Sequence, residues 1–285
     1  MEIIVGKTAG FCYGVKRAVD GAIEELKSNE DIFCLGEIVH NKQVISDLES
    51  KGMKFIDSLN ESNGKTIIRA HGVPKETYGL AEQKNIKIKD FTCPNVLKIH
   101  KIAEEYSNDG YYIFLCGNSS HPENIGTISY CGENYSIIEN EEDVDTALED
   151  FFKSNSKKLL LIAQTTYSLH RFENIKKKIY DSLDSKIEIL VKNTICRATE
   201  LRQKETRELS KNVDYMIIIG GKNSSNTKKL YEIAKEECDN SACIETESEL
   251  NIDEIKDFSR IGIMAGASTP QESIDKVVEK IDESK

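Results

Sequence analysis

The chain has 285 residues, of which 39% are hydrophobic and 31% charged, and its formal net charge is −11. This length is sufficient for one large domain or for two to three small ones. The negative charge argues against a general nucleic-acid-binding function, and no apolar run reaches the roughly 18 residues that a membrane span requires. Because the first residues lack a signal-peptide pattern, we expect a cytoplasmic protein.

The chain contains eight cysteines. In a cytoplasmic protein, this number indicates metal binding, redox chemistry or burial rather than a set of disulfides. No two cysteines have the C-x-x-C spacing, which argues against a zinc ribbon and against a thioredoxin-type site.

Three of the cysteines follow short apolar segments that resemble strands and precede amphipathic segments that resemble helices. A cysteine at such a junction lies near unpaired N–H groups and the positive end of a helix dipole, which favours the thiolate. Pro94 suits the first position of one of these helices because it has no N–H group. In chain order, the strand segments and their cysteines are 2–6 with Cys12, 86–88 with Cys93, and 187–191 with Cys196.

The same order of elements recurs three times. After each helical segment comes an apolar strand that ends in a glycine, and this glycine lies 24 residues beyond the cysteine each time. A second apolar strand follows in each unit. The equal offsets indicate an internal threefold repeat. The glycines are Gly36, Gly117 and Gly220, and the second strands cover 66–71, 159–165 and 261–268.

Alternating strands and helices predict an α/β fold with mostly parallel sheets, in which ligands bind at the carboxyl ends of the strands. The third unit lacks a final strand, and the N-terminal segment 1–12 supplies one. We therefore expect three pseudo-threefold-related α/β lobes around a central iron–sulfur cluster, with the N-terminal strand completing the third lobe. The predicted lobes are 13–92, 93–195, and 196–285 with 1–12.

Three thiolates that meet at one centre suit a cubane iron–sulfur cluster, in which the fourth iron has no protein ligand. Such an iron is a Lewis acid that can bind and polarise an oxygen atom. Zinc held by three cysteines is the alternative metal, although zinc cannot transfer electrons. The other cysteines do not follow the repeat and are assigned to packing; they are Cys34, Cys116, Cys131, Cys238 and Cys243.

Polar loops follow the strands of every unit. Four residues after the strand-end glycines stand His40, His121 and Ser224. Side chains of this kind at helix starts can bind phosphate in an acidic protein. Glu123 is the only carboxylate beside a histidine in these loops. The second set of loops contains His71, Gln164, Thr165 and Ser268.

Together these motifs resemble those of the IspH/LytB family, the 4-hydroxy-3-methylbut-2-enyl diphosphate reductases of the non-mevalonate isoprenoid pathway. The resemblance covers nearly the whole chain, and the set of motifs is highly specific. The matching segments are 10–15 with 17–19, 38–41, 69–73, 92–94, 121–123, 164–166, 194–199, 223–226 and 265–268.

The resemblance implies one 4Fe–4S cluster on Cys12, Cys93 and Cys196. It further implies the reductive dehydroxylation of (E)-4-hydroxy-3-methylbut-2-enyl diphosphate to isopentenyl and dimethylallyl diphosphate, with the substrate alcohol at the open iron. Glu123 would be the proton source, and Thr165 and His121 would relay the proton or orient the substrate. The remaining substrate-binding residues would be His40, His71, Ser224, Ser225, Asn226 and Ser268. Implied partners are the allylic diphosphate and an external electron donor such as ferredoxin or flavodoxin, and we expect a monomer.

Three residues depart from the family pattern, namely Glu37, Asn118 and Asn124. They concern loop rigidity and supporting hydrogen bonds rather than the ligands. Two other functions remain open. A quinolinate-synthase-like dehydratase would require an arginine-rich dicarboxylate pocket, and a non-catalytic iron–sulfur redox sensor would require a basic DNA-binding patch.

Overall fold

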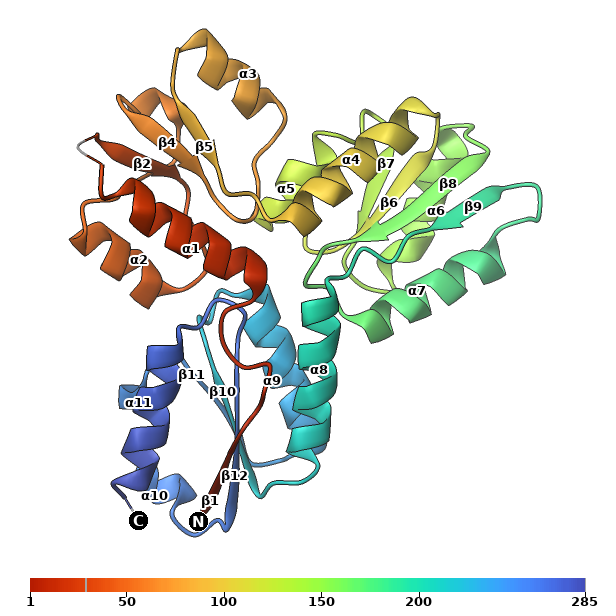
Figure 1. Cartoon of the computed structure of the whole chain (residues 1–285). Coiled ribbons are helices and arrows are strands. Elements are labelled where there is room, and N and C mark those ends of the chain that lie inside the picture. The colour runs from red at the N-terminus through yellow and green to blue at the C-terminus, as the bar shows by residue number, and fades with distance from the viewer. Residues whose placement is uncertain (29, 285) are drawn as a thin grey trace. The chain divides into compact units, whose positions relative to one another are not determined.

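The computed structural model describes residues 1–28 and 30–284 (Figure 1), which divide into two compact units. The first unit contains residues 1–17, 39–51 and the chain from 197 onward. The second unit contains residues 18–38 and 52–196. Helix α1 (Tyr13–Glu25) crosses from the first unit into the second.

The first unit is built on one parallel sheet with the strand order β1-β12-β10-β11. Ile261 of β12 lies opposite Ile3 of β1 on one side and opposite Tyr215 of β10 on the other. The prediction that the N-terminal strand completes this sheet is therefore confirmed. The strands are β1 (Glu2–Val5), β10 (Tyr215–Ile219), β11 (Ser241–Ile244) and β12 (Arg260–Ala265).

Helices cover both faces of this sheet. Ile274 and Val277 of α11 pack with the apolar side chains of one face, and Leu230 and Ala234 of α9 pack with those of the other. This arrangement buries the continuous apolar runs of β10 and β12 completely, as expected for a parallel sheet. The helices of the unit are α2 (Lys42–Ser50), α8 (Arg197–Ser210), α9 (Ser225–Glu237), η2 (Glu247–Glu249), α10 (Ile252–Ile255) and α11 (Gln271–Asp282).

The second unit contains two parallel sheets, with the orders β3-β2-β4-β5 and β7-β6-β8-β9. In the latter sheet, α6 and α7 cover one face and α4 covers the other. The strands are β2 (Ile32–Leu35), β3 (Lys54–Ile56), β4 (Lys65–Ile68), β5 (Ile88–Asp90), β6 (Tyr112–Cys116), β7 (Tyr135–Ile138), β8 (Lys158–Ala163) and β9 (Glu188–Val191). The helices are η1 (Leu59–Glu61), α3 (Glu76–Gln83), α4 (Pro94–Asn108), α5 (Pro122–Ile128), α6 (Asp143–Lys153) and α7 (Leu169–Ser182).

All three sheets have the same topology. Each begins with the strand that leads to a predicted ligand cysteine, continues with two inner apolar strands and ends in a second edge strand. The predicted α/β fold with three parallel sheets is thus confirmed, whereas the boundaries of the three lobes stay a prediction. The edge strands β3, β7 and β11 were not predicted, because they are short and most of their residues are only partly buried.

Within the described residues, every helix is too short or too polar to cross a membrane.

Candidate active site

The three predicted ligand cysteines occupy equivalent positions in the fold. Each immediately precedes a helix, and Cys93 is the N-cap residue of α4. In each case the cysteine N–H donates to the backbone carbonyl two residues beyond the end of a neighbouring strand. These bonds run from Cys12 to Ala267 (3.1 Å), from Cys93 to Ala70 (2.9 Å) and from Cys196 to Thr165 (2.9 Å). The repeat in the sequence is therefore also a repeat of hydrogen bonds.

Burial distinguishes these cysteines from four of the other five. The three predicted ligands are half-buried, and the described part of the chain contains no disulfide. By contrast, burial raises the pKa of the Cys34 and Cys131 thiols to about 12 and raises the pKa of Cys116 as well. Those thiols stay neutral inside the apolar core, so they are unsuited to metal binding.

Helix α4 contacts a second predicted ligand in the same unit. The Asn95 amide, two residues beyond Cys93, donates from Nδ2 to Cys196 Sγ over 3.0 Å. Hydrogen bonds to sulfur are among the contacts that tune iron–sulfur clusters. Half-buried thiols at helix starts, one of them with such a donor, fit the predicted cluster. Cys12 belongs to the first unit, and the meeting of all three sulfurs stays a prediction.

Two side chains of α8 hold the loop that leads to Cys12. Arg202 is 3% exposed and donates from Nε to the Thr8 carbonyl and from Nη2 to the Gly10 carbonyl, each over 2.8 Å. The Glu205 carboxylate accepts hydrogen bonds from the hydroxyl and N–H of Thr8 and from the preceding N–H. The backbone just before Cys12 is therefore fixed by charged groups, whose hydrogen bonds are stronger than those of neutral ones.

Neither Arg202 nor Glu205 was predicted from the sequence. A signal was present, because the buried positions of α8 recur with helical spacing but are polar. A search for apolar periodicity does not detect such a helix. The buried residues of this face are Thr199, Arg202, Gln203, Thr206 and Ser210.

Glu123 and Thr165, predicted as catalytic residues, lie in direct contact in the second unit. The Thr165 hydroxyl donates to Glu123 Oε2 and its N–H donates to Oε1, each over 2.6 Å. His121 is the N-cap of α5, and its Nδ1 accepts from the Glu123 N–H over 3.2 Å. The His71 ring lies edge-on to the His121 ring, with 5.5 Å between the ring centroids. Four of the predicted residues are thus brought together.

The environment of Glu123 changes its acidity. The side chain is 2% exposed, and burial raises the pKa of its carboxyl from 4.5 to about 7. The two hydrogen bonds from Thr165 oppose this change because they stabilise the carboxylate. A carboxyl with a pKa near neutrality can hold a proton and release it at the pH of the cell, as general acid catalysis requires.

The first unit brings together another part of the predicted set. Ser268 Oγ donates to the His40 carbonyl over 3.2 Å, and Gly221 lies against the same carbonyl, so closely that a Cβ atom there would be 2.5 Å from it. Ser224 is the N-cap of α9, and its Oγ accepts from the Thr227 N–H over 3.3 Å. Ser225, half-buried, begins the helix.

Asn226, in the first turn of α9, is buried without hydrogen bonds for its side chain. It is 3% exposed, and neither Oδ1 nor Nδ2 has a partner among the described residues. An unsatisfied buried amide costs about 1–3 kcal/mol. A ligand with acceptor oxygens at this place would give Nδ2 a partner, which fits the predicted role in substrate binding.

Asn118 and Asn124, two of the residues that depart from the family pattern, form hydrogen bonds between loops. The Asn124 amide donates from Nδ2 to the Asn118 carbonyl over 2.7 Å and to Gln164 Oε1 over 2.9 Å. The Asn118 N–H donates to the same Gln164 oxygen over 3.2 Å. These bonds join the loop after β6 to the loop after β8. Glu123 and Thr165 are next to Asn124 and Gln164 in the chain, so the same bonds help to keep them in place.

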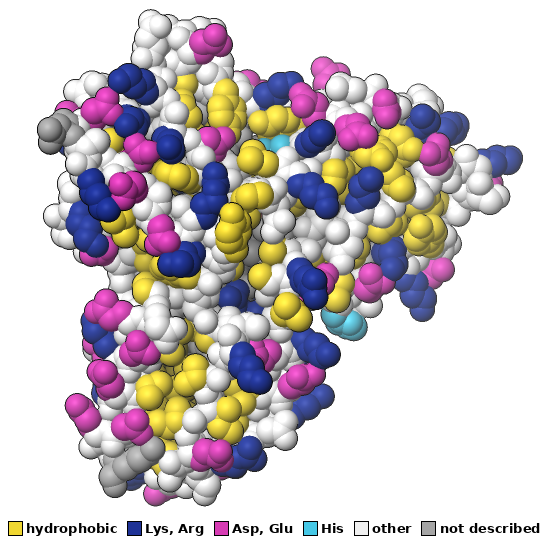
Figure 2. All heavy atoms as spheres, viewed as in Figure 1, with side chains coloured by type: hydrophobic (Ala, Val, Ile, Leu, Met, Phe, Trp, Pro, Cys, Tyr) yellow, Lys and Arg dark blue, Asp and Glu magenta, His cyan; other side chains and the backbone are white. Residues whose placement is uncertain are grey.

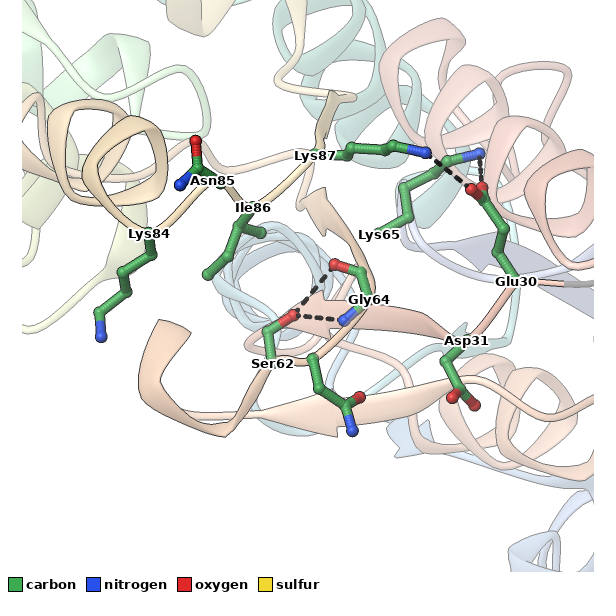
Figure 3. Close-up of a pocket in the computed structure, with 10 residues that line it drawn as sticks. Glu30, Asp31, Ser62, Gly64, Lys65, Lys84, Asn85, Ile86 and Lys87 are labelled. Atoms are coloured by element: carbon green, nitrogen blue, oxygen red, sulfur yellow. Dashed lines mark hydrogen bonds and ion pairs between the residues drawn. The ribbon is translucent and has the colours of Figure 1, made fainter.

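A separate pocket of about 430 Å³ lies at the amino ends of β2, β4 and β5 (Figure 3). Its lysines are largely engaged with acidic groups, since Lys65 lies 2.6 Å from Glu30 and Lys87 lies 3.0 Å from it. None of the predicted site residues, all of which belong to the described part of the chain, lines this pocket. Ligands of parallel α/β sheets bind at the opposite edge, so this pocket is not the candidate active site.

We expect the Glu123 carboxyl to titrate near pH 7, which infrared or carbon NMR titration of labelled glutamate can measure. Thr165→Val should raise this pKa further, because it removes an O–H donor to the carboxylate. Ionisation of a buried carboxyl disfavours folding, so its contribution to the free energy of unfolding should decline as the pH rises from 4.5 to about 7. A Glu123 signal that titrates near pH 4.5 would contradict this prediction.

Arg202→Lys should weaken retention of the predicted cluster by about tenfold or more, as loss of supporting contacts around a metal site does. The measurement is iron and sulfide per chain after anaerobic purification, followed by the rate of iron loss to a chelator. Glu208→Gln, on the exposed side of the same helix, is the control and should leave both values unchanged. Equal iron retention in the two variants would exclude a positioning role for Arg202.

Comparison with known proteins places this geometry in a family. A model of the LytB protein family matches residues 3–282. A protein of Alkaliphilus oremlandii (strain OhILAs) is 44% identical over 285 residues, which is 99% of both chains. A protein of Clostridioides difficile (strain 630) is 42% identical over 281 residues, 98% of both chains. Both are named 4-hydroxy-3-methylbut-2-enyl diphosphate reductase.

Two solved structures agree with this result. One, described as (E)-4-hydroxy-3-methyl-but-2-enyl diphosphate reductase, the terminal enzyme of the non-mevalonate pathway, has a TM-score of 0.71 at 39% identity and covers 99% of this chain and 100% of its own. The other, described as the E-1-hydroxy-2-methyl-but-2-enyl-4-diphosphate reductase from Plasmodium falciparum, has a TM-score of 0.89 at 31% identity. The match covers 98% of this chain and 87% of the other. The chain belongs to the LytB family.

Proposed function

We propose that this protein catalyses the reductive dehydroxylation of (E)-4-hydroxy-3-methylbut-2-enyl diphosphate, the last step of the non-mevalonate isoprenoid pathway. The reaction uses two electrons and two protons. It breaks the C–O bond of the allylic alcohol and gives water together with isopentenyl or dimethylallyl diphosphate. The observation that carries the proposal is the buried Glu123 carboxyl, held by Thr165 beside His121, in a chain whose relatives bear the name of this reductase.

We propose that Cys12, Cys93 and Cys196 hold one 4Fe–4S cluster. When bound, such a cluster supplies electrons and a Lewis-acidic iron. The chain contributes half-buried thiols at three helix starts and the Asn95 amide at one of the sulfurs. The Asn95 N–H donor can hydrogen-bond to a sulfur that is bound to iron, which is one of the contacts that tune such clusters.

In this proposal, Glu123 delivers a proton to the departing oxygen. Hydroxide is a poor leaving group, and a positioned general acid typically contributes about 10²–10⁴-fold to the rate of such a step. The Thr165 N–H and hydroxyl hold both carboxyl oxygens, so they set the direction of proton transfer. His121 keeps the first turn of α5, and with it Glu123, in place.

The diphosphate group is proposed to bind polar side chains of the predicted set. These side chains can donate hydrogen bonds to phosphate oxygens, so the site does not depend on a positive net charge of the protein. The buried amide of Asn226, unpaired among the described residues, supports this role most directly. The proposed set is His40, His71, His121, Thr165, Ser224, Ser225, Asn226 and Ser268.

The remaining expectations belong to the same proposal. The two electrons come from an external donor such as ferredoxin or flavodoxin, and the protein acts as a cytoplasmic monomer. Membership in the LytB family favours this reaction over a quinolinate-synthase-like dehydration and over a purely sensory role.

Cys93→Ser should abolish the visible absorption of the cluster and reduce iron and sulfide per chain, since it removes one of the proposed ligands. The matched control is Cys243→Ser, which changes a half-buried cysteine outside the repeat. We expect the control to keep its absorption after anaerobic purification. An unchanged spectrum in Cys93→Ser would remove this residue from the ligand set.

Glu123→Gln should reduce turnover by at least about 10²-fold, because the amide cannot donate the required proton. Substrate affinity should change by less than about tenfold, since the shape of the side chain is kept. Turnover is measured anaerobically with dithionite-reduced viologen and the allylic alcohol diphosphate. Glu133→Gln, at an exposed position, serves as the control, and turnover of Glu123→Gln equal to that control would exclude Glu123 as the proton donor.

A further inference from the structure

Helix α4 leaves an apolar side chain in solvent close to the proposed cluster ligands. Leu97 is 42% exposed, whereas its neighbours Val96 and Ile99 are 2% and 1% exposed in the core. A single exposed leucine is common on protein surfaces. Its significance therefore depends on the groups around it.

Two lysines lie beside Leu97 on the surface of α4. Lys98 and Lys101 are exposed on the outer side of the same helix, where residues three and four positions apart are neighbours. Within the part of the chain that the structure describes, neither lysine forms an ion pair.

Many other lysines of this chain, whose net charge is −11, do form ion pairs in the described structure. Lys75, which reaches α4 from another element, pairs with Glu104, and Lys178 lies 2.9 Å from Asp145. Glu105 is the exposed acidic residue on the outer side of α4. In Figure 2, dark blue and magenta side chains both lie beside yellow ones over α4.

The surface lies next to two of the proposed ligands. Helix α4 begins directly after Cys93, four residues before Leu97. Asn95, on the exposed first turn of the helix, donates to Cys196 Sγ. A protein bound over Leu97 would therefore lie within about two helical turns of Cys93 and of Asn95, which contacts Cys196.

We propose that the surface formed by Leu97, Lys98 and Lys101, here called the Leu97 patch, is the docking site for a small acidic protein that carries single electrons. The inference rests on the proposed function, which requires two electrons per turnover. Two carrier molecules would dock in succession, each giving up one electron and leaving oxidised. The patch thus assigns a place on this chain to the external donor.

The chemistry of the patch suits such a partner. Unpaired lysines attract an acidic carrier over a distance of about 8–10 Å at moderate salt and repel basic proteins. An exposed leucine at the centre gives the complex a small apolar contact. Electron-transfer complexes typically have small interfaces and are short-lived, so a docking site for such a partner does not require a large apolar surface.

The test is the double variant Lys98→Glu with Lys101→Glu. We expect it to weaken binding of an oxidised acidic ferredoxin by about tenfold or more in calorimetry at low ionic strength, and to weaken the salt dependence of binding. Turnover with ferredoxin as the donor should fall through a higher KM. Turnover with reduced viologen, which needs no docking surface, should stay within about twofold of the original protein.

The matched control is Lys157→Glu with Lys177→Glu, which makes the same change of charge at exposed positions of the same unit. This control should bind ferredoxin as the original protein does. Equal loss of ferredoxin binding in both double variants would attribute the effect to net charge and overturn the proposal. Unchanged binding in the Lys98 and Lys101 variant would overturn it as well.

The experiment separates this inference from the proposed function. If the original protein converts the allylic diphosphate with viologen while the double variant binds ferredoxin normally, the docking site is wrong and the reductase function stands. If no viologen-driven turnover occurs in a protein with full iron content, the proposed function itself fails, and the docking proposal fails with it.

Discussion

A single backbone hydrogen bond, repeated three times, constrains the arrangement of the candidate site. In each sheet the N–H of a cysteine is bound to the chain just beyond the end of a neighbouring strand. Because parallel strands end at a common edge, this bond places a thiol, a helix start and a polar loop at the same edge. Thr165, which supplies one of these carbonyls, also holds Glu123. The proposed ligand set and the proposed acid therefore depend on the same few backbone positions.

Glu123 shows how two opposite effects produce a useful acid. Removal from water disfavours the carboxylate, and the donors of Thr165 favour it, so the pKa comes to lie near neutrality. On the outer face of α4, by contrast, the charged groups stay in water. Its lysines keep their hydration and remain unpaired within the described chain, so their charge acts outward on molecules in solution. The same unit thus contains a buried carboxyl that can hold a proton and a hydrated, basic surface that is proposed to bind a partner.

Much of the fold could be predicted because equal spacing between Cys12, Cys93 and Cys196 and their strand-end glycines reveals the repeat before any strand is drawn. The pairing of β1 with β12 followed from a missing strand in one unit and an extra one in another. Arg202 and Glu205 could not be predicted in the same way, since α8 buries a polar face and apolar periodicity is blind to it. The contact between Asn95 and Cys196 depends on tertiary packing that no local pattern encodes.

The pairing of β1 with β12 has a consequence for biosynthesis. Strand β1 leaves the ribosome well before its partner β12 (Arg260–Ala265), so it stays unpaired until β12 has been made. The sheets of the second unit use only residues between Ile32 and Val191 and can form while translation continues. We expect the second unit to mature first and Cys12, although made earliest, to be the last of the three cysteines to reach its final position.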